Sequence, residues 1–154
     1  MKKLANHPSN AVWLLIVLQF LLGLGALAGG AALVMASDGS ILQMPLSSLE
    51  HSPFPNYLIP GVILFILLGV YPLVVAYSLW QQPAWRWPEA LNPIKDKHWS
   101  WVASLSVGVI LVIWITVQVL LIRSIASLHV LYFIWGWVLI LLTLNKSVRG
   151  YCSH

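Results

Sequence analysis

Four long apolar stretches, separated by three more polar segments, dominate the pattern of the chain. The stretches cover residues 11–35, 57–80, 99–122 and 128–144. A helix needs about 20 residues to cross the hydrocarbon core of a bilayer, and the fourth stretch lies at the short end of that range. Because backbone groups in lipid must be hydrogen-bonded within their own segment, each stretch is expected to be a helix. The pattern predicts an all-α fold, a membrane four-helix bundle formed by a single transmembrane domain over residues 1–154.

The composition supports the same class. Of the 154 residues, 60% are hydrophobic and 8% are charged, whereas a soluble domain carries about 25% charged residues. The lysines and arginines occur singly and form no patch, so nucleic acid is not an expected partner. The only cysteine is Cys152, which excludes an internal disulfide and a metal-binding cysteine pair.

The basic residues outside the apolar stretches predict an orientation. The segment 36–56 carries no lysine or arginine, and the turn after the third stretch carries only Arg123. Since basic loops stay in the cytoplasm, we expect both termini to be cytoplasmic, in a multi-pass protein of the bacterial inner membrane. The other seven basic residues would then share the cytoplasmic side: Lys2, Lys3, Arg86, Lys95, Lys97, Lys146 and Arg149.

The segment between the first and second stretches contains "SSLEHSPFPNYLIPG", residues 47–61. Pro45 favours a helix start, and Ser47 with Glu50 has the spacing of a capping box. These two signals predict a short helix on the extracytoplasmic membrane surface. The prolines that follow favour extended backbone, and Asn56 is the expected N-cap of the second span.

Residue types that serve acid–base chemistry or metal binding gather on the predicted outer side. This candidate outer cluster consists of Asp38, Glu50, His51, Arg123 and His129. Glu50 and His51 are adjacent and would point about 100° apart in a helix, so we do not expect them to pair with each other. An ion pair of Asp38 or Glu50 with Arg123 is the favoured interpretation, and a membrane enzyme with an extracytoplasmic site is the alternative. No catalytic motif, metal motif or cofactor motif occurs, so none of these is predicted.

No charged residue lies in the middle of any span, which argues against an ion pump or a proton-coupled carrier. The deepest polar candidates are Gln19, Tyr71 and Gln118. They are expected either to hydrogen-bond between helices or to line a narrow polar path. Pro72 removes a backbone donor from the second span and predicts a kink there.

Small residues are expected to pack the helices, because lipid offers helices no hydrophobic reason to associate. The first span carries the GxxxG pair Gly25 and Gly29, and the third span places Ser100, Ser104 and Gly108 on one face. Contact within the bundle is the first interpretation, and contact with another subunit is the alternative.

The segments "MPLSSLEHSPFPNYLIPG", "WITVQVLLI" and "SVRGY" resemble a group of small bacterial four-span membrane proteins that are known as uncharacterised or hypothetical. The resemblance covers most of the chain, and the "SPFPNYLIPG" elbow is its most specific part. Members of that group often carry an acid near the position of Gln118, so this chain departs from the group there. The resemblance implies the four-span fold and no particular activity.

Three functional hypotheses follow. The leading one is a non-catalytic integral membrane protein, acting as an accessory or structural subunit or as a small binding module. Its expected partners are membrane lipids, other membrane subunits or further copies of the chain. The alternative is a small carrier or channel for an apolar or weakly polar solute such as a lipid or a quinone, which requires a continuous cavity along Gln19, Gln118 and Tyr71. The extracytoplasmic enzyme is the third.

Overall fold

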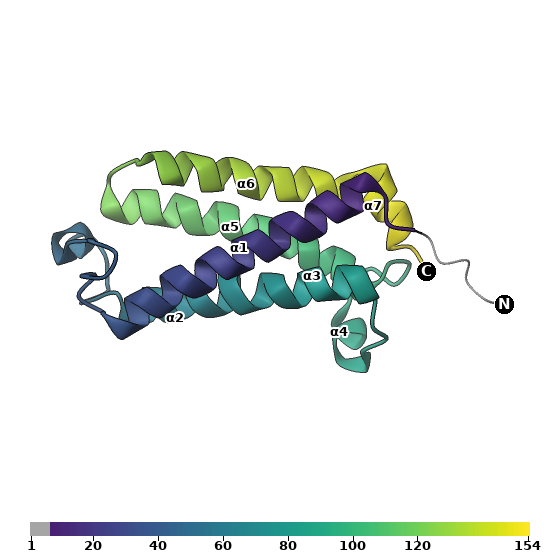
Figure 1. Cartoon of the computed structure of the whole chain (residues 1–154), viewed down its shortest axis with the longest axis horizontal. Coiled ribbons are helices and arrows are strands. Elements are labelled where there is room, and N and C mark those ends of the chain that lie inside the picture. Colours follow the sequence, from purple (N-terminus) through teal and green to yellow (C-terminus); the bar gives the residue numbers. More distant parts are fainter. Residues whose placement is uncertain (1–6) are drawn as a thin grey trace.

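The computed structural model describes residues 7–154 and contains four helices that are long and apolar enough to cross a membrane (Figure 1). They run over Asn10–Met35, Leu58–Gln81, Trp99–Ile122 and Ser127–Leu144. The predicted all-α, four-helix fold class is therefore confirmed, and the bounds lie within one residue of those expected from the sequence. Lys2 and Lys3, which contribute to the orientation argument, lie outside the described residues.

The four spans are joined by short helical elements. The first span is α1 (Asn10–Met35), the third is α5 (Trp99–Ile122) and the fourth is α6 (Ser127–Leu144). The second span is continuous but has three parts, namely α2 (Leu58–Ile63), the π-helix η2 (Leu64–Val70) and α3 (Tyr71–Gln81). The connections contain the 3₁₀ helix η1 (Leu46–Leu49), α4 (Arg86–Leu91) and, after α6, α7 (Lys146–Tyr151).

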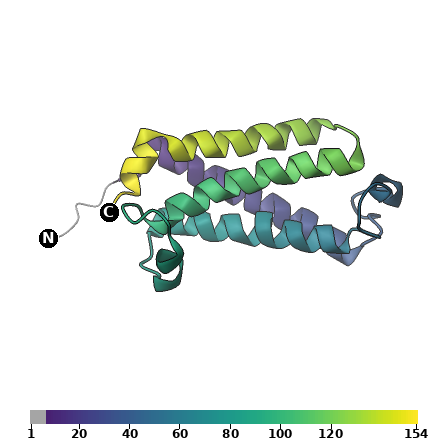
Figure 2. The ribbon, with the colours of Figure 1, turned by 180° about the vertical axis from the view of Figure 1, so that it is seen from behind.

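The spans form two antiparallel hairpins, one of α1 with the second span and one of α5 with α6 (Figures 1 and 2). The connections 36–57 and 123–126 lie at one end, which we call the hairpin end. The C-terminus, α4 and α7 lie at the other, the terminal end. Helix α1 crosses the bundle diagonally, so it lies beside α7 at the terminal end and beside α2 at the hairpin end. The two hairpins therefore diverge toward the hairpin end.

Two pairs of glycines let α1 approach the second span closely. A Cβ on Gly23 would lie 2.9 Å from the Gly69 carbonyl oxygen, and a Cβ on Gly30 would lie 2.9 Å from that of Gly61. The approach is equally close from the other helix, because a Cβ on Gly61 would lie 3.2 Å from the Gly30 carbonyl oxygen. These glycines bring two backbones into direct contact, as small residues do in membrane helix pairs.

The α5–α6 pair has its own glycine contact. A Cβ on Gly108 would lie 2.7 Å from Ile140 Cγ1 and 3.0 Å from the Gly136 oxygen. The GxxxG pair of α1 sits differently. A Cβ on Gly25 would meet only the Tyr132 hydroxyl, at 3.8 Å, and one on Gly29 would meet Leu64 Cδ2 at 3.6 Å, which are ordinary contact distances.

The irregularity expected at Pro72 takes the form of the π-helix that precedes it. The Tyr71 N–H donates to the carbonyl of Ile66, five residues earlier, instead of four. Pro72 has no N–H to return to the preceding turn. A wider π turn directly before the proline is one of the recognised ways in which a helix absorbs such a loss.

Candidate functional site

Among the described residues, no hydrogen bond or ion pair joins the members of the candidate outer cluster to one another. The Asp38 carboxylate accepts a hydrogen bond of 3.0 Å from the backbone N–H of Ser40, and this bond lowers the pKa of Asp38 below its ordinary value. Glu50 and His51 follow η1 and are exposed. The ion pairs within residues 7–154 are Lys97–Asp96 and His154–Glu89, so no ion pair joins Asp38 or Glu50 to Arg123.

The predicted capping box of Ser47 and Glu50 does not form, and other contacts hold the connection before the second span. Helix η1 has Pro45 as its N-cap and no side-chain cap. Asn56 Oδ1 accepts from the Leu58 N–H at 3.0 Å, one residue ahead of the nominal cap position at Tyr57. The Tyr57 side chain is buried and donates through its hydroxyl to the Pro45 carbonyl at 2.9 Å. This bond holds the connection against the start of the second span.

Arg123 and His129 bracket the α5–α6 turn. Arg123 adopts the left-handed conformation that ends α5, with φ 55°, and its side chain is exposed. His129 Nδ1 accepts a 3.0 Å hydrogen bond from the Ala126 N–H and so caps the start of α6. Because Nδ1 is the acceptor, the proton of the neutral ring must reside on Nε2.

Gln19 is fully buried and links three spans through side-chain hydrogen bonds in the part of the bundle nearer the terminal end. Its Nε2 donates to Ser104 Oγ at 3.0 Å, and Ser104 lies 2.8 Å from Thr143 Oγ1. Thr143 in turn donates to the Leu139 carbonyl at 2.7 Å, so the Ser104 hydroxyl must be the donor to Thr143. All three side chains that link the helices are fully buried. The Gln19 Oε1 atom is buried without a hydrogen-bond partner.

The other two intramembrane candidates lie apart from Gln19. The Tyr71 hydroxyl is 2.7 Å from Ser106 Oγ, which joins the second span to α5. Gln118 lines a cavity that includes neither Gln19 nor Tyr71. This cavity therefore does not connect the three side chains.

The cavity that contains Gln118 lies where the two hairpins diverge, and we call it the hairpin cavity. It has a volume of about 290 Å³ and is lined by α1, η2, α5, α6 and the 36–57 connection. Leu42 and Met44 of that connection cover its end, and Gly25 and Gly29 form part of its α1 wall. Because neither glycine has a side chain, the cavity is wider at these two positions.

Three polar side chains line the hairpin cavity, and its remaining walls are apolar or aromatic. They are Gln118 on α5 and His129 and Tyr132 on α6. Within residues 7–154, the Gln118 amide, the His129 Nε2–H and the Tyr132 hydroxyl have no hydrogen-bond partner. His129 also lines a second hollow of about 270 Å³ between α5 and α6. The lining of the hairpin cavity contains no aspartate, glutamate, lysine or arginine.

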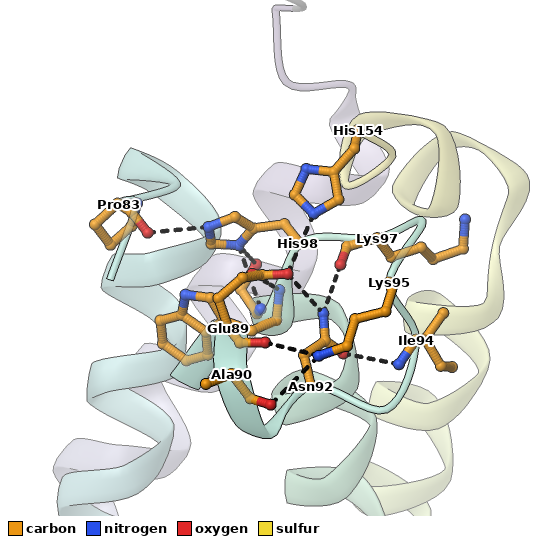
Figure 3. Close-up of polar contacts among 11 residues, drawn as sticks. Pro83, Glu89, Ala90, Asn92, Ile94, Lys95, Lys97, His98 and His154 are labelled. Atoms are coloured by element: carbon orange, nitrogen blue, oxygen red, sulfur yellow. Dashed lines mark hydrogen bonds and ion pairs between the residues drawn. The ribbon is translucent and has the colours of Figure 1, made fainter. Parts of the chain in front are cut away.

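A polar network at the terminal end holds the connection between α3 and α5, residues 82–98, which we call the middle loop (Figure 3). The sequence did not indicate this network. Glu89 of α4 accepts from the Trp99 N–H at 3.2 Å, which caps α5, and from the Asn92 amide at 3.1 Å. His154 Nε2 lies 3.4 Å from the same carboxylate. Burial alone raises the pKa of Glu89, but the hydrogen bonds from Asn92, Trp99 and His154 outweigh it and lower this pKa.

Asn92 and His98 complete this network. The buried Asn92 amide also donates to the Lys97 carbonyl at 2.6 Å. His98 Nε2 lies 3.1 Å from the Pro83 carbonyl, and Nδ1 lies 2.8 Å from Ser100 Oγ. The loop thus satisfies its own buried polar groups, as buried polar groups generally require. The only signal in the sequence is the three-residue spacing of Glu89 and Asn92.

A cleft of about 320 Å³ lies beside the network, and Cys152 forms part of its wall. The thiol is buried, and burial raises its pKa to about 11. Residues 7–154 contain no group of three or more histidine, cysteine, aspartate or glutamate side chains placed to hold a metal ion. The network is therefore best explained as the structural anchor of the loop and the C-terminus.

Comparison of the chain with protein-family models, with curated proteins and with solved structures finds no match. The hairpin cavity is therefore the feature from which we infer a function.

Proposed function

We propose that this protein is a small non-catalytic binding module of the bacterial inner membrane that takes a lipid-soluble ligand from the bilayer into the hairpin cavity. The single observation that carries the proposal is the position of the cavity. Its rim residues Gly25, Leu42 and Leu128 are exposed, and Gly25 lies in the middle of the first span. A ligand can therefore enter sideways from lipid.

The chemistry of the lining supports the same occupant. Ligand sites are typically mostly apolar, with a few polar groups that fix orientation, and the hairpin cavity has this composition. A charged ligand would be placed in an uncharged site of low polarity, at a large desolvation cost. The proposed ligand is therefore apolar with an uncharged polar group.

The distribution of basic residues supports an orientation with the terminal end in the cytoplasm. Under this orientation the hairpin cavity opens into the outer half of the bilayer. Association with other membrane subunits or with further copies is compatible with a binding module and forms part of the proposal.

A continuous path through the protein, as a carrier or channel requires, receives less support than a binding site that opens only toward the lipid. Gln19, Ser104 and Thr143 are fully buried on the terminal-end side of the hairpin cavity, and none of them lines it. An extracytoplasmic enzyme likewise receives less support, because among the described residues no ion pair joins Asp38 or Glu50 to Arg123.

The test is native mass spectrometry of protein extracted with its lipids. Gly25→Leu places a side chain in the cavity, and Ala28→Leu adds the same bulk at an exposed position one turn further along α1. The proposal expects the wild type and Ala28→Leu to retain a bound lipid-soluble molecule and Gly25→Leu to lose it. Equal retention by all three proteins would overturn the proposal.

A further inference from the structure

We propose that the ligand of the hairpin cavity is a quinone, a flat ring that carries two opposed carbonyl groups and an apolar tail. This inference rests on the proposed function and names the ligand class of the same site. It follows from the unpartnered polar groups, the aromatic walls and the size of the cavity.

The polar groups present donors. The hydrogen bond from the Ala126 N–H to His129 Nδ1 places the ring proton on Nε2, which leaves an N–H donor without a partner among the described residues. The Gln118 side chain adds an amide donor, and the Tyr132 hydroxyl adds a third. A ligand whose polar atoms are carbonyl oxygens accepts from all of these groups.

The donors come from different walls. Gln118 lies on α5, whereas His129 and Tyr132 lie one turn apart on α6. Donors on two helices match a ring with carbonyls on opposite edges better than a single ester group. Binding such a ring would also give these half-buried donors hydrogen-bond partners.

The remaining features select a ring. Trp114 and Tyr132 supply flat aromatic surfaces, and aromatic rings favour offset stacking. A volume of about 290 Å³ lies at the lower limit for small-molecule sites. It accommodates one ring with the start of its tail rather than a whole two-chain lipid, and the tail would leave past Gly25 into the bilayer.

The experiment measures equilibrium binding of a decyl-substituted benzoquinone to the purified full-length protein in nanodiscs. The variants are Gln118→Met, Tyr132→Phe and His129→Asn. His129→Asn keeps an acceptor near the Nδ1 position for the Ala126 N–H but removes the Nε2 donor. Thr116→Val is the matched control, because Thr116 bonds its own helix at Val112 and does not line the hairpin cavity.

The inference expects saturable binding, with each of the three cavity variants weakening it by roughly five- to tenfold, the effect of one lost hydrogen bond. Thr116→Val should bind like the wild type, and thermal denaturation should show that all variants are folded. Diacylglycerol, an uncharged lipid with ester carbonyls, should compete poorly.

Two results would overturn the inference while leaving the proposed function standing. The first is retention of a lipid that Gly25→Leu removes, without quinone binding or with quinone binding that the three variants do not change. The second is diacylglycerol binding with the same dependence on Gln118, Tyr132 and His129. If the wild-type protein neither retains a lipid nor binds the quinone, both proposals are wrong.

Discussion

Gln19 on α1 donates to Ser104 on α5 across 3.0 Å, at a point where both side chains are fully buried. The Ser104 hydroxyl in turn donates to the Thr143 hydroxyl of α6. One amide thus joins the two hairpins in the part of the bundle nearer the terminal end, since Ser104 lies in the first turns of α5 and Thr143 in the last turn of α6.

The two partners should differ in what their removal costs. Gln19→Met removes one hydrogen bond and also the unpartnered Oε1 atom, so we expect a loss of about 0.6 kcal/mol, the usual worth of such a bond in a membrane. Ser104→Ala leaves the whole Gln19 amide buried and unpaired, so we expect about 2 kcal/mol.

A double-mutant cycle on the free energy of unfolding in mixed micelles measures this difference. Thr116→Val, at an exposed hydroxyl that bonds its own helix, is the control. Equal losses for Gln19→Met and Ser104→Ala, or a coupling energy of zero, would contradict the account.

The glycines of α1 and α5 should respond in opposite ways to alanine. Gly108→Ala forces its Cβ against Ile140 and the Gly136 carbonyl, so we expect a loss of about 1–3 kcal/mol. Gly25→Ala meets nothing closer than 3.8 Å and removes a helix-disfavouring residue, so it should be neutral or stabilising by up to about 1 kcal/mol. Thermal denaturation of both variants tests the pair. A large loss at Gly25 would show that the GxxxG pair packs tightly after all.

The Glu89 carboxylate should make the protein sensitive to acid. Its folded pKa is lowered below the ordinary 4.5, so its stabilising contribution is present above that pH and is lost as the pH falls through the folded pKa. Glu89→Gln should reduce stability at neutral pH by about 1 kcal/mol, as expected for a lost helix cap.

Thermal denaturation from neutral to acidic pH tests this prediction. The gap between the wild type and Glu89→Gln should narrow as the pH falls below 4.5. Glu50→Gln, which changes an exposed carboxylate without an ion pair in the described structure, should leave the profile unaltered. A gap that widens in acid would refute the assignment.

Cys152 gives a direct report on the terminal end, because it is the only cysteine in the chain. The thiol is 1% exposed and its pKa is raised to about 11, so at neutral pH almost no reactive thiolate is present. Alkylation should be slow in the folded protein and fast after denaturation.

Loosening α7 should accelerate the same reaction. Asn145 Oδ1 accepts from the Ser147 N–H at 2.9 Å and caps this helix. Asn145→Ala should therefore raise the alkylation rate of Cys152, whereas Asn56→Ala, which removes a cap at the opposite end, should not. Rapid alkylation of the folded wild type would show that the C-terminus is not anchored as described.

The spans could be predicted because length and apolar content decide them, and these are properties of the sequence itself. The choice among glycines could not. Gly25 and Gly29 have the recognised spacing, yet the close approaches fall at Gly23 and Gly30, because the crossing direction of the second span decides which face of α1 is covered.

For the hairpin cavity, the sequence indicates individual residues but not which of them come together. The sequence indicates both Gln118 and His129 as candidates but in separate groups, since only the arrangement of the two hairpins brings them to one cavity. The burial of Asn92 under Glu89 and Lys97 depends on the path of a loop, which no periodicity records.

The most direct test of the central claim is a structure of the protein determined in lipid nanodiscs. The account predicts continuous elongated density in the hairpin cavity, in contact with Gln118 and Tyr132 and leading out past Gly25 into the bilayer. A cavity closed by inward movement of α6, with the Gln118 amide bonded within the protein, would contradict it.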